Sequence, residues 1–135
     1  MLTIEVKRHD QGEGYFAPWI EEHDDGGCTY HVHYDDVSDE GAQYLSHLIT
    51  QQVRRRWRPR PPGAPAGRCM PVIWHRCPML DDREVVAVDD RPDLLVYTVR
   101  ADLITERGAR GIARAQEGLT AGWVRVASRR RPQTV

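Results

Sequence analysis

The chain has 135 residues and a net charge of only −1, with 40% hydrophobic and 29% charged residues. This size and composition predict one globular domain over residues 1–128, followed by a basic tail at 129–135, and they exclude a disordered chain. The longest apolar runs, at 85–88 and 94–97, are far shorter than the ~20 residues of a membrane-spanning helix, so we expect no membrane partner.

The first half of the chain predicts three strands and a long helix. Leu2 to Val6 alternates apolar and polar side chains, which is typical of a half-buried strand. Residues 15–22 and 28–35 flank a turn cluster at 24–27 and predict a hairpin, with Pro18 marking an edge or a bulge. Ser38 predicts the N-cap of a helix over 38–57, which has an apolar stripe formed by Leu45, Leu48, Ile49, Val53 and Trp57.

The second half predicts an irregular loop at 58–68 and then mostly strands. Strands are expected at 70–76, 84–90, 93–101 and 123–126, with a second helix from 105 to 117. No internal repeat is evident. The order of these elements predicts an α+β fold: an antiparallel sheet with two helices on one face, and a ferredoxin-like core with extra N-terminal strands.

Charge is distributed very unevenly along the chain. Residues 1–50 hold eleven acids and two bases, whereas residues 51–68 hold six arginines and no acid. Residues 69–106 return to acid excess, and residues 107–135 hold seven arginines against Glu117. Such asymmetry indicates a partner surface more than a reaction.

The arginines fall on both predicted helices. The last turn of the first helix carries Arg54, Arg55 and Arg56, and the second helix carries Arg107, Arg110 and Arg114 at helical spacing. If the two sets join into one patch, it would bind an anionic macromolecule, either nucleic acid or an acidic protein surface. The sequence therefore favours a non-enzymatic binding or regulatory module without a cofactor, and a sheet edge near Pro18 favours a homodimer.

The alternative is a small metal-dependent enzyme or metal-binding domain. His31 and His33 share one face of a predicted strand, and His75 and Cys77 share a face of another, so these four side chains could hold a divalent metal, with Asp35 nearby. The spacing matches no common zinc motif. No nucleophile elbow or P-loop is present in the sequence, and three cysteines without an export signal predict a reduced, cytoplasmic protein.

Two further hypotheses depend on other segments. The eleven acids of residues 1–50 could mask a basic partner or mimic nucleic acid. Gly108-Ala-Arg-Gly111, followed by an expected helix and strand, is similar to the Gly-x-x-Gly region of KH domains over about 25 residues. That resemblance implies a loop that holds a nucleic-acid backbone.

Overall fold

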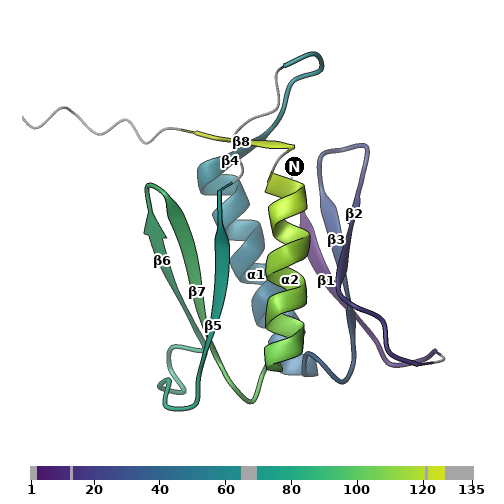
Figure 1. Cartoon of the computed structure of the whole chain (residues 1–135), viewed down its shortest axis with the longest axis vertical. Coiled ribbons are helices and arrows are strands. Elements are labelled where there is room, and N and C mark those ends of the chain that lie inside the picture. The colour runs from purple at the N-terminus through teal and green to yellow at the C-terminus, as the bar shows by residue number, and fades with distance from the viewer. Residues whose placement is uncertain (1–2, 13, 65–69, 121, 127–135) are drawn as a thin grey trace, which may run out of the picture.

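The computed structural model describes residues 3–12, 14–64, 70–120 and 122–126. Two helices lie between two three-stranded sheets, giving three layers, and a short two-stranded ribbon lies across the helix ends (Figure 1). The fold is therefore a mixed α+β fold with three small sheets. The expected single antiparallel sheet and ferredoxin-like core are not confirmed, since both three-stranded sheets contain a parallel pair.

The first sheet has the order β1-β3-β2, and its strands are β1 (Ile4–His9), β2 (Trp19–Glu22) and β3 (Cys28–His33). The expected hairpin of β2 and β3 is confirmed, with Trp19 opposite His31. Helix α1 (Asp39–Arg56) follows, and the hydroxyl of Ser38 accepts a hydrogen bond from the amide of Gly41 as the sequence predicts. Its buried stripe of Leu45, Ile49 and Val53 faces the core.

The second sheet repeats this plan with the order β5-β7-β6. Its strands are β5 (Val72–Cys77), β6 (Val86–Arg91) and β7 (Leu94–Arg100), and helix α2 (Glu106–Thr120) follows. In both sheets the first strand pairs parallel with the third, and the second pairs antiparallel with the third. The strands β4 (Trp57–Pro59) and β8 (Trp123–Arg125), each after its helix, pair antiparallel with one another.

The chain therefore contains a structural repeat, contrary to the prediction that no repeat is present. Ser38 donates its backbone N–H to Leu103 O at 2.9 Å, and its counterpart Thr105 donates to Asp36 O at 2.8 Å. These reciprocal contacts relate the halves by an approximate two-fold axis along the helices. Sequence reasoning missed the repeat because its identities are few, including the pairs Tyr30/Tyr97, Gly41/Gly108 and Trp57/Trp123.

Both sheets and both helices contribute to one hydrophobic core. Gln116 of α2 lies at its centre and links the two sheets. Its side-chain carbonyl accepts a hydrogen bond from the indole of Trp74 at 2.7 Å, and its amide nitrogen lies 3.2 Å from the hydroxyl of Tyr30. All three side chains are buried, so these hydrogen bonds pair polar groups that water cannot reach.

Neither helix in the described part of the chain has the length and the apolar content needed to span a membrane. The basic tail expected at 129–135 lies outside the described residues, and so does Cys69.

Candidate binding surface on helix α2

Helix α2 presents an outward face between two sheet edges. Strand β5 ends one sheet on one side of the helix, and strand β2 ends the other sheet on the opposite side (Figure 1). The exposed arginines Arg107, Arg110 and Arg114 recur along this face, as their spacing predicts. We call the surface formed by these three arginines the α2 face.

Two of these arginines already have acidic neighbours. The Nε of Arg107 lies 3.0 Å from Oδ1 of Asp36, and the guanidinium of Arg107 lies 3.5 Å from the ring centre of Tyr15. Arg110 pairs with Glu106 at 2.7 Å along the helix. Among the described residues no ion pair involves Arg114, so its charge is the most available one for a partner.

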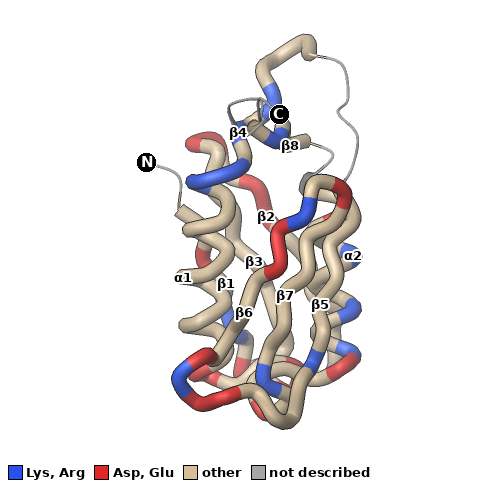
Figure 2. The backbone as a smooth tube through the Cα atoms, turned by 90° about the vertical axis from the view of Figure 1, so that its left-hand side faces the viewer, with Lys and Arg blue, Asp and Glu red and all other residues tan. Residues whose placement is uncertain are grey.

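The second set of arginines lies at the other end of the molecule. Arg54, Arg55 and Arg56 occupy the last turn of α1, whereas Arg107 occupies the first turn of α2, and the two helices run in the same direction (Figures 1 and 2). Arg56 contacts Asp90 at 2.9 Å, and Arg125 contacts the same carboxylate at 3.0 Å. The structure therefore does not join the two sets into one patch.

Asp36 is the residue that holds the base of the α2 face in place, a buried role that the sequence did not indicate. Its carboxylate is fully buried and accepts hydrogen bonds at Oδ1 from the hydroxyl of Thr105 at 2.9 Å and from Arg107. The other oxygen, Oδ2, has no hydrogen-bond partner within the described residues. Its counterpart in the second half is the apolar Leu103. An alignment of the two halves would therefore have marked Asp36 as a charged residue at a buried position.

The Gly-x-x-Gly segment lies inside α2 and forms no loop. A Cβ on Gly108 would come within 2.8 Å of the Cβ of Asp36, and a Cβ on Gly111 within 2.5 Å of Pro18. These glycines therefore allow the helix to pack closely against neighbouring segments, and the loop implied by the KH resemblance is not formed.

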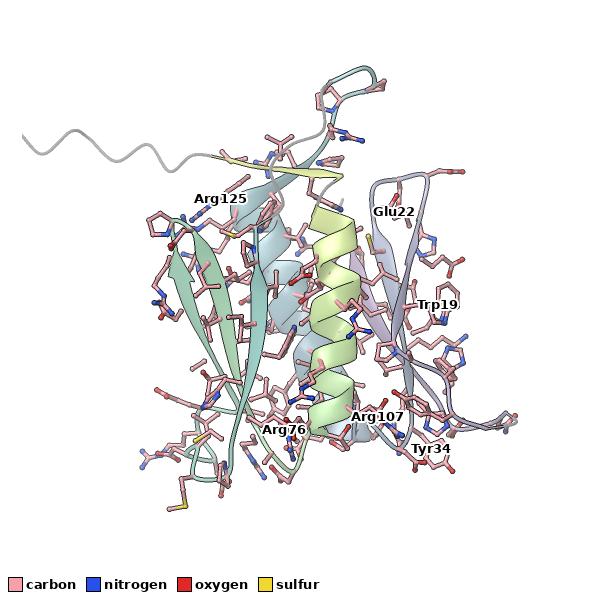
Figure 3. The ribbon with its side chains drawn as sticks, viewed as in Figure 1. Trp19, Glu22, Tyr34, Arg76, Arg107 and Arg125 are labelled. Carbon is pink, nitrogen blue, oxygen red and sulfur yellow. The ribbon has the colours of Figure 1, made fainter. Side chains whose placement is uncertain are left out.

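His31 and His33 lie on the same face of β3, as predicted, and both are buried. Trp19 stacks on His31 with ring centres 4.1 Å apart, and Phe16 packs edge-on against His33 at 5.5 Å. Nε2 of His9 lies 2.7 Å from Nδ1 of His31. These contacts hold Phe16 and Trp19 against the outer face of the first sheet, where Trp19 is labelled in Figure 3.

The contacts around His31 accompany shifted pKa values at His9 and Glu21. Burial, and then the neighbouring His31, lower the pKa of His9 below its ordinary value. The hydrogen bond from His31, at 2.9 Å, lowers the pKa of Glu21. Both shifts favour a neutral His9 and a charged Glu21 carboxylate, each in contact with a different ring nitrogen of His31, at neutral pH.

The four predicted metal ligands do not come together. His75 and Cys77 belong to β5 in the second sheet, on the other side of the helix layer from His31 and His33. The described part of the chain has no group of three or more His, Cys, Asp or Glu side chains placed to hold an ion. Cys28 is buried, and burial raises the pKa of its thiol to about 12.

Grooves run along both sides of the α2 face. The larger, about 680 Å³, lies between α2 and β5, and Arg110 and Arg114 line it together with Trp74, His75 and Ala113. A second, about 420 Å³, lies toward β2, and Pro18, Trp19 and Arg114 contribute to it. The α2 face is therefore a cationic ridge with a groove on each side, and a third hollow, about 590 Å³, borders all three of its arginines beside Tyr15 and Ala17.

Comparisons of the chain with models of known protein families, with curated proteins and with solved structures found no match.

Proposed function

We propose that this chain is a non-enzymatic binding module that holds an acidic protein surface on the α2 face. The observation that carries the proposal is the ridge of Arg107, Arg110 and Arg114 between two grooves. Charged groups on the rim of such a surface steer an oppositely charged partner, and the grooves supply shape and apolar area.

An acidic protein fits this surface better than nucleic acid does. The ridge from Arg107 to Arg114 is about 10 Å long at 1.5 Å per helical residue, and two of its three arginines already contact carboxylates. Three arginines can neutralise only about three phosphates, against the roughly six to ten phosphate contacts that a DNA-binding protein can make. The cations at the end of α1 belong to the helix on the opposite side of the view from α2 in Figure 2, so they do not extend this footprint.

The proposal is tested with two polyanions, labelled poly-L-glutamate and a short DNA duplex, by fluorescence anisotropy at low and at physiological salt. Replacing Arg110 and Arg114 together by Ala should weaken binding of poly-L-glutamate about tenfold, since each exposed charge contact contributes about 0.5–1 kcal/mol. The matched control replaces Arg83 and Arg91 by Ala, which removes the same charge from the turn before β6 and from the end of β6, and it should change the affinity little.

Equal weakening by both double variants would mean that only net charge matters, and would overturn the proposal. Tighter binding of DNA than of poly-L-glutamate, lost when Arg54, Arg55 and Arg56 are replaced by Ala, would overturn it in favour of nucleic acid at the other end of the molecule.

A further inference from the structure

The two halves of the repeat differ at the corresponding edge of their sheets. In the first half, α1 covers the outer edge of β1 with two hydroxyls. The backbone N–H of Val6 donates to Ser46 Oγ at 2.8 Å, and that of Ile4 donates to Thr50 Oγ1 at 3.3 Å. Thr50 also donates to Ile4 O at 2.8 Å. The edge of β1 is therefore closed to any further strand.

The corresponding edge of β5 has no such cover. The carbonyls of Pro71 and Cys77 accept hydrogen bonds from the β7 side, so the alternate residues Val72, Trp74 and Arg76 direct their backbone groups away from the sheet. The counterparts of Ser46 and Thr50 on α2 are Ala113 and Glu117. Among the described residues, no hydrogen bond links α2 to the backbone of Val72 or Trp74.

In the second half, a groove lies where the first half has the hydroxyls of Ser46 and Thr50. It is the hollow of about 680 Å³ between β5 and α2, and its floor includes the small side chains of Ala109 and Ala113. A row of outward backbone donors and acceptors beside such a groove is what an added β-strand pairs with. A strand of about six residues would match the length of β5.

The charge and the exposure of the residues around the groove indicate which side chains an added strand would carry. One set of its alternating side chains would point toward α2, where Arg76, Arg110 and Arg114 outnumber Glu106 and Glu117 in the lining of the groove, which favours acidic residues. The other set would lie beside Ile73, which is 47% exposed on the outer face of β5 and favours apolar residues. Residues 72–77 contain His75 and Arg76 and no acid, so a second copy of β5 would add a further cation to a groove whose lining already has more arginines than acids.

We infer that β5 and the α2 face together take an extended segment of a partner protein, alternating acidic and apolar residues, as an added strand of the second sheet. This inference rests on the proposed binding role of the α2 face and specifies its mode. Backbone pairing to β5 supplies affinity, and Arg114 selects acidic residues at alternate positions.

The probe is a capped peptide of about seven residues that alternates Glu and Val, titrated into the labelled protein and followed by NMR. We expect binding to protect the amides of Val72 and Trp74 from exchange with solvent. The same peptide with alternate amides N-methylated keeps its charge, loses the donors that pair with β5, and should lose binding.

The decisive variant is Ala113→Ser, which transfers the Ser46 hydroxyl of the first half to the second. Its Oγ is expected to accept from the amide of Trp74 and to weaken peptide binding about fivefold, the equivalent of roughly 1 kcal/mol. The matched control is Ala115→Ser, the same change on the β2 side of the same helix, which should leave the affinity unchanged.

The outcomes separate this inference from the proposed function. Equal affinity of the normal and N-methylated peptides, with an unchanged response to Ala113→Ser, would overturn strand addition while binding of poly-L-glutamate still supports the α2 face. Failure to bind either peptide or poly-L-glutamate would overturn both. Protection of Val72 that appears with rising protein concentration and without peptide would overturn the inference in favour of a second copy.

Discussion

Replacing Gln116 by Leu tests whether a polar bridge holds the two halves together. Leu fills a volume similar to that of Gln and keeps the helix propensity of α2, so the change removes hydrogen bonds with little change in packing. The bridge joins the indole N–H of Trp74 to the hydroxyl of Tyr30 across the core.

The expected cost follows from the groups left behind. Trp74 is 8% exposed and Tyr30 is 2% exposed, so neither polar group gains water when Gln116 is lost. An unpaired buried donor or acceptor costs about 1–3 kcal/mol, so two of them predict a loss of about 3 kcal/mol in the free energy of unfolding.

Equilibrium unfolding in urea, followed by far-UV circular dichroism, measures this loss. Gln43→Leu is the matched control, because Gln43 is exposed on α1 and should change stability by less than about 0.5 kcal/mol. In the Tyr30→Phe background, Gln116→Leu should cost about 1 kcal/mol less, because the partner hydroxyl is already absent. A loss below about 0.5 kcal/mol for Gln116→Leu, or no coupling to Tyr30, would refute the reasoning.

Three other predictions follow from close packing and from shifted pKa values. Gly108→Ala should destabilise the fold by about 1–3 kcal/mol, because the new Cβ would meet Asp36, whereas Gly118→Ala should stabilise it by about 0.5–1 kcal/mol in thermal unfolding, because nothing lies near that position. The pKa of His9 is lowered below the ordinary 6.5, so the folded state binds fewer protons than the unfolded chain. Stability should therefore fall as pH drops through about 6.5 and level off below the folded pKa, and His9→Gln should flatten this profile of melting temperature. With its thiol pKa raised to about 12, Cys28 should resist iodoacetamide at pH 8 until the protein unfolds, and rapid labelling of Cys28 in the native state would contradict the burial.

Local elements could be predicted from the sequence because their signals are local. The cap at Ser38 and the stripe of Leu45, Ile49 and Val53 define α1 without reference to the rest of the chain. The turn between β2 and β3 defines their hairpin in the same way. The pairing of β1 with β3 could not be predicted, because a parallel neighbour is chosen by the shared core and leaves no mark between the two strands.

In the candidate site, too, only the local features could be predicted from the sequence. Helical spacing was enough to place Arg107, Arg110 and Arg114 on one face. Helical spacing could not show that Asp36, which lies 71 residues before Arg107 in the sequence, would be buried in contact with that arginine. The contrast between Ser46 and Ala113 became visible only when the two halves could be superposed by their topology.

The most direct test of the open β5 edge is amide hydrogen exchange of the protein without peptide. We expect Ile4 and Val6, whose amides donate to hydroxyls of α1, to exchange much more slowly than Val72 and Trp74, by about tenfold or more. We also expect Ala113→Ser to slow the exchange of Trp74 selectively. Equal protection of the two edges, with no response of Trp74 to the new hydroxyl, would contradict the claim that the second half has an edge available for a partner strand.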